Sequence, residues 1–337
     1  MKRKINVAQI GVGYWGPNLL RNLVANSDCQ VKKVVDFSRE RQAFVLGLYP
    51  SIAVADNVDI VFDDVDIDAV VIATPVATHY TLAMKALQSG KHILVEKPFA
   101  TTIQQVQDIG ETAKEKGLVA MAGHTFLYNS AVRYVKKVID SGEIGDIRYI
   151  YSQRLNLGRI RNDVNALWNL APHDISIIQY WLNNLEPVAI SVNGMDYVQK
   201  NIEDVVFMNI TYPGKIMANI HVSWLDPLKV RRMTVVGSKK MIVYDDIADN
   251  KVSICDMGID HKKEMHPNME FDEMKPAQFI HRFGDILLPK IDWREPLKEE
   301  IDHFLDCIRN GTPCLSGVDH AMGVVKILSA SNNTGGK

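Results

Sequence analysis

Residues 5–16 read INVAQIGVGYWG, an apolar run followed by glycines at the spacing G-x-G-x-x-G. The run Ile5 to Ile10 predicts a buried strand, and Pro17 suits the first turn of a helix. Between a strand and a helix, this spacing is typical of a dinucleotide-binding turn, because the glycines let the backbone approach a pyrophosphate at the helix N-terminus. The alternative is a glycine turn in an α/β unit that binds no ligand. The three glycines are Gly11, Gly13 and Gly16.

A second apolar run, Val31 to Val35, ends in Asp36, which lies 20 residues beyond Gly16. At this place a carboxylate accepts hydrogen bonds from the adenosine ribose hydroxyls and repels a 2′-phosphate. We therefore predict NAD as the cofactor in preference to NADP. Arg39 and Arg41 follow closely, and their charges can soften that repulsion.

Short β-rich runs alternate with helical patterns over the first third of the chain. A helix is predicted from Thr102, where Gln105 completes a capping-box pattern, to Gly117. Strands that alternate with helices are typical of a doubly wound parallel sheet, which we assign to residues 1–122. The predicted strands are Ile5–Ile10, Val31–Val35, Ala69–Ala73, His92–Val95 and Val119–Ala122.

From Gly123 onward, alternating and β-branched runs follow one another with little helix between them, which predicts a mostly antiparallel sheet. A helix near Trp168 to Trp181 interrupts these runs, and closing helices are predicted from about residue 296, at 296–309 and 318–329. Residues 123–337 are therefore predicted to form a second, α+β domain. The predicted strands are Ile147–Leu155, Val188–Val192, Val205–Tyr212, Lys215–Trp224, Met233–Gly237 and Lys240–Tyr244.

The composition is that of an ordinary globular protein. The 337 residues are 47% apolar and 23% charged, with a net charge of −2. This length is about twice the ~150 residues expected per domain, which supports two domains. The balanced charge gives no reason to expect nucleic acid as a partner, and no run of about 18 apolar residues predicts a membrane span.

The four cysteines lack the spacing of a zinc site or of a disulfide framework. They are Cys29, Cys255, Cys307 and Cys314. We therefore expect reduced thiols, a cytoplasmic location and no bound metal.

Four further motifs carry a family resemblance: ATPVATHY at 73–80, GKHILVEKPFA at 90–100, GHTFLYNSAV at 123–132 and WNLAPHDISI at 168–177. Together with the glycine turn, they resemble the Gfo/Idh/MocA oxidoreductases, the family of glucose-fructose oxidoreductase and inositol dehydrogenase. The resemblance implies an NAD-binding Rossmann domain and an open-faced sheet domain that builds homodimers or homotetramers. It also implies hydride exchange between nicotinamide and a sugar or polyol carbon.

Lys97 and His173 are the candidate catalytic residues. Oxidation of an alcohol requires a basic or hydrogen-bonding group at the hydroxyl, and a histidine pKa near ~6.5 suits that task. Lys97 follows a predicted strand, and the resemblance suggests a cis bond to Pro98; without the resemblance, a solvated turn lysine is the simpler interpretation. Many family members carry a carboxylate four residues before the histidine, where this chain has Asn169. Asp174 is a possible substitute, and either Lys97 or His173 can be the base.

The resemblance also implies cofactor contacts beyond the glycine turn. Thr74, Pro75 and His79 match positions near the ribose and nicotinamide, and Glu96, with Lys97 beside it, matches a contact to the nicotinamide ribose. His79 can equally be a packing or capping residue. Tyr14 and Trp15, inside the glycine turn, are predicted beside the cofactor, and packing between the domains explains them as well.

An arginine-rich stretch predicts an anionic substrate. Arg154, Arg159 and Arg161 lie within eight residues, and arginine binds phosphate or carboxylate in bidentate fashion. Similar stretches occur in family members that act on nucleotide-linked sugars, including sugar 3-dehydrogenases and 3-ketoreductases; a solvated loop is the alternative. The other predicted substrate contacts, Tyr128, Asn129, Asn169 and His173, follow from the resemblance.

Three functions are compatible with these observations. The preferred one is an NAD-dependent dehydrogenase of a nucleotide-linked sugar. The second is a dehydrogenase of a free inositol, polyol or sugar. The third is an NAD-binding regulatory protein without turnover, which the Asn169 substitution keeps open and the presence of both Lys97 and His173 disfavours.

Overall fold

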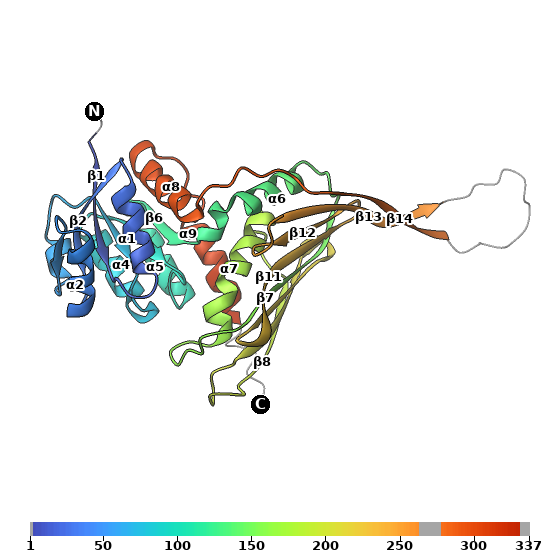
Figure 1. Cartoon of the computed structure of the whole chain (residues 1–337), viewed down its shortest axis with the longest axis horizontal. Helices are drawn as coiled ribbons and strands as arrows, with labels where there is room; N and C mark the ends of the chain where they lie inside the picture. The colour runs from blue at the N-terminus through green and yellow to red at the C-terminus, as the bar shows by residue number, and fades with distance from the viewer. Residues whose placement is uncertain (1–2, 263–277, 331–337) are drawn as a thin grey trace, which may run out of the picture.

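The computed structural model describes residues 3–262 and 278–330, so the end of the predicted second domain, 331–337, lies outside the described residues. Two sheets organise the chain, one in the first third and one in the remainder (Figure 1). Sheet A has six parallel strands in the order β3-β2-β1-β4-β5-β6. The strands are β1 (Ile5–Ile10), β2 (Cys29–Val35), β3 (Ala53–Ala55), β4 (Ala69–Ile72), β5 (His92–Glu96) and β6 (Ala120–Gly123).

Sheet A confirms the predicted doubly wound fold, with the short β3 as an unpredicted edge strand. Successive residues of β1 face opposite sides: Val7 packs with α1 and Ala8 packs with α4 and α5. The strand order reverses between β1 and β4, and ligands of such sheets bind at the carboxyl ends near this reversal. The helices are α1 (Gly16–Ala25), α2 (Arg39–Leu48), α3 (Asp59–Phe62), the 3₁₀ turn η1 (Val76–Thr78), α4 (His79–Gln88) and α5 (Ile103–Glu115).

The predicted capping residue of α5 is confirmed, since the Thr102 side chain accepts the Gln105 N–H at 3.2 Å. The Gln105 side chain accepts instead from the backbone N–H of Thr101, at 3.1 Å. Both contacts satisfy N–H groups that a helix start would leave without a partner.

Sheet B has eight strands in the order β14-β13-β12-β11-β7-β10-β9-β8, and is antiparallel except where β7 pairs with β10. The predicted sheet is thus confirmed, while β13 and β14 were not predicted. The strands are β7 (Ile147–Leu157), β8 (Ala189–Met195), β9 (Val205–Tyr212), β10 (Ile216–Ser223), β11 (Leu225–Gly237), β12 (Met241–Asp245), β13 (Val252–Lys262) and β14 (Gln278–Leu287). The 3₁₀ turn η3 (Pro213–Lys215) joins β9 to β10.

Helices α6 (Ser130–Asp140) and α7 (Ala166–Trp181) cover one face of sheet B and share its apolar core. The sequence interpretation missed α6, although Val132, Val135 and Val138 recur at helical spacing. Asn129 decides the start of α6, because its side chain accepts the N–H groups of Ala131 and Val132. The 3₁₀ turn η2 (Thr125–Tyr128) leads into this cap.

The opposite face of sheet B carries exposed apolar side chains. Phe207, Met217 and Phe283 are 45%, 58% and 79% exposed. Figure 1 shows β13 and β14 extending beyond the rest of the sheet, away from sheet A. This face has no covering layer among the residues that the structure describes.

The closing helices α8 (Pro296–Asn310) and α9 (Val318–Ser329) join the two halves. Ile301 and Phe304 of α8 belong to the same apolar cluster as β1 and α1. On α9, Val325 packs into the other cluster of sheet A, whereas Ile327 packs into the core of sheet B. Helix α8 therefore packs on sheet A, and helix α9 packs between the two halves.

Across residues 3–262 and 278–330, every helix is too short or too polar to be a candidate for a membrane-spanning segment.

Candidate active site

A cavity of about 1350 Å³ lies between the carboxyl ends of sheet A and the inner part of sheet B. Its wall contains the glycine turn, the end of β5, α7 and the start of β11. Seven Lys or Arg side chains line it against four Asp or Glu side chains, so its wall carries excess positive charge although the whole chain does not. Such a cavity favours an anionic ligand.

Within the glycine turn, Gly11 and Gly16 are packed against protein atoms, and Gly13 has open space beside it. Gly11 has φ +93°, and a Cβ there would lie 2.7 Å from the Ala73 carbonyl oxygen. At Gly16 a Cβ would lie 2.6 Å from the Gly11 carbonyl oxygen, which explains why helix and strand need glycine here. A Cβ built on Gly13 would have no atom within 4 Å, and Gly13 lines the cavity, so a ligand can come close to the protein backbone at this residue. These features fit a pyrophosphate at this turn.

Gln9 supports the turn from inside, which sequence reasoning did not predict. Its Nε2 donates to the carbonyl oxygens of Gly11 and Gly16, each at 2.9 Å. Gln9 and Asn6 are the two polar residues of β1, and only the structure shows that Gln9 is the fully buried one.

Asp36 stands at the cavity wall, at the end of β2. Its carboxylate oxygens accept the N–H groups of Val12, at 2.7 Å, and Ser38, at 2.9 Å. These bonds tie the carboxylate to the glycine turn and fix its direction. Of the two nearby arginines, Arg41 lines the cavity and Arg39 does not.

Tyr14 and Trp15 both line the cavity, as do Thr74 and Pro75. Tyr14 is 87% exposed and Trp15 is 40% exposed, so neither ring packs in an apolar core. The structure thus brings these four predicted cofactor residues to one wall.

His79 occupies a different place from that wall. It is buried, and its two ring nitrogens lie 2.9 Å from the carbonyl oxygens of Thr74 and Pro98. Burial lowers the pKa of this imidazole. A neutral imidazole has one N–H and donates to one of these two carbonyls, and the cavity wall does not include His79.

Lys97 lies at the base of the cavity, and its peptide bond to Pro98 is cis, as the resemblance suggests. Its Nζ donates to the Asn169 carbonyl oxygen at 3.1 Å. Burial lowers the pKa of Lys97 to about 8; the charges of Arg154 and Arg161 act in the same direction and Glu96 opposes them. A lysine with this pKa can exchange a proton near neutral pH.

Glu96 precedes this lysine and also lines the cavity. Burial raises the pKa of Glu96 to about 7, against the influence of Lys97. Its Oε2 accepts the Lys97 N–H at 3.2 Å, while its buried Oε1 has no hydrogen-bond partner among the described residues. The free oxygen can accept a hydrogen bond from a ligand hydroxyl.

His173 lies on α7, one turn beyond the carbonyl that binds Lys97, and lines the same cavity. Its ring packs 4.9 Å from the Phe126 ring, measured between centroids. Burial, and then the charge of Lys97, holds the pKa of His173 well below its usual range, so the imidazole is neutral. Its buried Nδ1 lacks a hydrogen-bond partner within the described part of the chain.

Asp174 does not replace the carboxylate that Asn169 lacks. Its oxygens accept hydrogen bonds from Ser152 and Arg154, each at 2.6 Å, and the residue is 1% exposed. Asp174 instead holds the Arg154 guanidinium in the cavity wall, 4.8 Å from the Phe126 ring. The Asn169 backbone, rather than a carboxylate, contacts Lys97.

Some of the predicted substrate residues line the cavity, and others lie outside its wall. Asn129 and Arg161 line the cavity, and Arg161 forms an exposed ion pair with Asp163 at 2.5 Å. Tyr128 is buried behind the wall, where its hydroxyl lies 2.9 Å from the Ser316 hydroxyl. Arg159 is exposed outside the wall.

Sequence reasoning missed a second set of polar wall residues from sheet B. Arg231 forms an ion pair with Asp246 at 3.3 Å, and Asp246 also accepts the Tyr244 hydroxyl at 3.0 Å. Lys229 lines the cavity and forms no ion pair with any residue the structure describes. No motif marks these residues, which reach the cavity only because β11 pairs with β7.

Comparisons with known proteins identify the family. The GFO/IDH/MocA oxidoreductase family model, with an NAD-binding Rossmann fold, matches residues 5–124, and the GFO/IDH/MocA C-terminal domain model matches residues 132–243. The uncharacterized oxidoreductase YdgJ of Escherichia coli (strain K12) is 31% identical over 89% of this chain and 84% of that protein.

A second relative has a defined activity in its name. UDP-N-acetylglucosamine 3-dehydrogenase of Acidithiobacillus ferrooxidans is 30% identical over 67% of this chain and 69% of that protein. A solved structure of that enzyme from the same organism superimposes with a TM-score of 0.81 at 23% identity, covering 99% of this chain and 98% of the other. The superposition shows a shared fold.

Proposed function

Because the chain belongs to the GFO/IDH/MocA oxidoreductase family, we propose that it transfers a hydride between NAD and a carbon of a nucleotide-linked sugar. One observation carries the proposal: a single cavity joins the glycine turn, the Lys97 and His173 pair, and further cations from sheet B. The dinucleotide would bind at the glycine turn, the reacting hydroxyl at Lys97 and His173, and the substrate phosphates at the cations from sheet B.

Asp36 supports NAD over NADP. Both of its oxygens are held by backbone N–H groups at the point where an adenosine ribose lies in such folds. A 2′-phosphate there would meet a fixed negative charge, and Arg41, which lines the same cavity, is a cation able to offset it.

Asp36→Ala is expected to narrow the ratio of NAD to NADP affinities, because it removes both the ribose acceptor and the repulsion. Titration of both cofactors into the wild type and the variant measures this ratio. Glu40→Ala, which removes an acid from the first turn of α2 outside the cavity wall, is the matched control. A wild-type preference for NADP would contradict the assignment.

The proposed chemistry divides between cofactor and protein. When bound, the nicotinamide supplies the hydride acceptor or donor. Lys97 Nζ and the neutral His173 imidazole hold the reacting hydroxyl, and Lys97, with its lowered pKa, exchanges its proton. Asn169 fixes Lys97 through its backbone carbonyl, so the role does not require a carboxylate at that position.

The substrate proposal rests on cations beyond the catalytic pair. Lys229 forms no ion pair within the described part of the chain, and Arg161 pairs with Asp163, whose side chain is exposed. Phosphate oxygens bind such groups through charge-assisted hydrogen bonds, whereas a neutral polyol leaves them without a counter-charge.

Arg161→Ala and Lys229→Ala are each expected to weaken binding of a UDP- or dTDP-sugar by about 1.5–3 kcal/mol and to leave NAD binding unchanged. Isothermal titration of the NAD-loaded protein, with the nucleotide sugar and with the matching free sugar, measures the difference. Lys137→Ala removes a charge from α6 outside the cavity wall and serves as control. Equal affinity for the two ligands would favour the free-polyol function, and absence of turnover with retained NAD binding would favour the regulatory one.

We also propose that the exposed apolar face of sheet B packs against a second copy of this chain. Met195, Phe207 and Met217 stand on that face, and the stacked rings of Phe207 and His221 lie 4.2 Å apart. Light scattering of the purified chain tests for a dimer or tetramer.

A further inference from the structure

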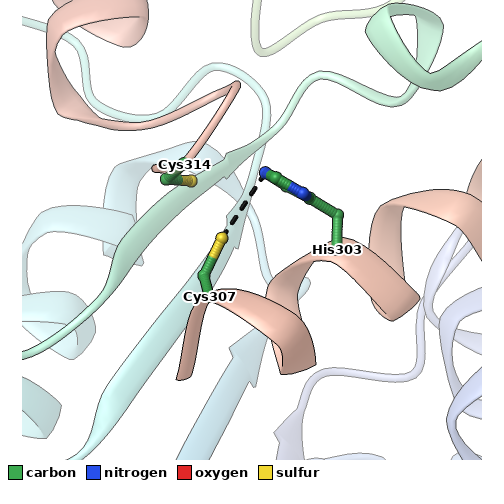
Figure 2. Close-up of side chains that lie close together, drawn as sticks. All are labelled: His303, Cys307 and Cys314. Atoms are coloured by element: carbon green, nitrogen blue, oxygen red, sulfur yellow. Dashed lines mark hydrogen bonds between the residues drawn. The ribbon is translucent and has the colours of Figure 1, made fainter. Parts of the chain in front are cut away.

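Three side chains at the end of α8 form a cluster away from the cavity (Figure 2). His303 and Cys307 lie one helical turn apart on α8, and Cys314 returns to them after the chain turns at Gly311, where φ is +68°. One ligand atom from each residue lies within 4.8 Å of the other two. The spacing of the cysteines gave no sign of this proximity, because it depends on the turn.

The hydrogen bonds of this cluster disfavour a metal ion. His303 Nε2 accepts the Leu315 N–H at 3.0 Å and lies 3.4 Å from Cys307 Sγ, so its lone pair is already engaged. Within the described residues the group contains three potential ligands, whereas structural zinc sites use four. Two thiols side by side remain as the reactive feature.

We propose that Cys307 and Cys314 form a dithiol site that a low-molecular-weight disulfide, such as oxidised glutathione, converts reversibly to an intramolecular disulfide bond. Cys307 is 3% exposed and Cys314 is partly exposed, so the oxidant reaches Cys314. Cys314 follows the turn after α8, outside any helix or strand, and Figure 2 shows it beside the Cys307 sulfur.

The reaction proceeds by two exchanges. The Cys314 thiol gives its proton to the neighbouring Cys307 thiolate, to which it donates a hydrogen bond, as the Cys314 sulfur attacks the small disulfide; a mixed disulfide forms and one small thiolate leaves. Cys307 then attacks the Cys314 sulfur, forming the protein disulfide and releasing the second small thiol. The protein loses two electrons and two protons, and the oxidant is reduced to two thiols.

The polar environment suits Cys307 for the second step. The Cys314 thiol, as hydrogen-bond donor, lowers the pKa of Cys307, and His303 acts in the same direction. The same contact raises the pKa of Cys314. In the mixed disulfide Cys314 no longer carries an S–H, so His303 remains the group that lowers the pKa of Cys307 and favours its thiolate for the second step.

The product would join the last turn of α8 to the segment that supports sheet A. In that segment Ser316 accepts the Ala122 N–H at 2.8 Å, and its hydroxyl bonds to Tyr128. None of the three cluster residues lines the cavity, so oxidation can be followed without reference to turnover.

The test equilibrates the intact protein with oxidised and reduced glutathione, alkylates remaining thiols under denaturing conditions, and determines mass and peptide linkage. We expect the wild type to lose two of its four alkylatable thiols, with a 307–314 link that dithiothreitol reverses. Cys307→Ser should accumulate a glutathione adduct on Cys314, and Cys314→Ser should leave Cys307 unmodified. Cys255→Ser, which removes the other partly exposed thiol, should form the link normally.

Retention of four alkylatable thiols at every glutathione ratio would overturn the proposal. So would a link through Cys255, or a stoichiometric Zn²⁺ that is retained on purification and protects Cys307 and Cys314. Circular dichroism of each serine variant establishes that it is folded, and Cys307→Ala provides a second variant should the buried serine unfold the chain.

Discussion

Lys97→Ala is expected to lower turnover by about 10²- to 10⁴-fold while leaving NAD affinity and thermal unfolding nearly unchanged, because it removes a positioned proton-transfer group. The lysine lies at the base of the cavity and is held by the Asn169 carbonyl. Its removal therefore stops proton transfer at the reacting hydroxyl and leaves the packing of the apolar core unchanged. Steady-state kinetics with an identified sugar substrate, with NAD titration alongside, measure both effects.

His173→Ala should produce a loss of the same order, and the double variant should fall well short of the product of the two losses. Two groups that hold one hydroxyl act as a unit, so either change already removes the shared function. Wild-type turnover by Lys97→Ala would contradict the active-site assignment.

The pH profile separates the two candidate bases. Protonated Lys97 cannot accept the hydroxyl proton, so the rate of alcohol oxidation should rise with pH and level off above its pKa of about 8. His173, with a pKa well below its usual range, is neutral throughout that interval and adds no inflection there, whereas Glu96, with a pKa of about 7, titrates at its lower end. An oxidation rate independent of pH between 7 and 9 would assign the proton to another group.

Asp174→Ala is expected to lower the free energy of unfolding by about 3–5 kcal/mol, because it leaves the Arg154 charge buried without its partner. The side chains of this pair are 2% and 7% exposed, and Ser152 completes the carboxylate's hydrogen bonds. Urea unfolding followed by circular dichroism measures the loss.

Asp163→Ala is the matched control, since it removes the acidic partner of another arginine in the same wall. That pair is 43% and 44% exposed, and an exposed ion pair contributes about 0–1 kcal/mol. Equal unfolding free energies for the two variants would show that Asp174 and Arg154 gain nothing from their burial together.

The parallel sheet was predictable because its signals are local. A strand buried on both faces is an unbroken apolar run, as in β4, and the glycine turn directly follows the mostly apolar β1. The helix α6 was missed although its signals are local too, since Val132, Val135 and Val138 recur at helical spacing after the Asn129 cap.

For the site, sequence motifs identified Lys97, His173 and the glycine turn, which the structure brings to one cavity. Motifs did not indicate where a polar side chain points. His79 turns inward to two backbone carbonyls, and Tyr128 lies behind the wall against Ser316. Each of these directions depends on the packing of neighbouring elements.

The sequence by itself determined the two-sheet fold and the dinucleotide turn, because each depends on the periodicity or spacing of neighbouring residues. Lys97 and His173 became catalytic candidates through the family resemblance of the motifs that contain them. Only the tertiary structure decided that Asp174 serves Arg154, that Lys229 enters the cavity, and that Cys307 meets Cys314. The physical reason is that strand pairing, helix packing and turns between elements bring these groups together. Local apolar periodicity does not predict such contacts between residues that are distant in the sequence.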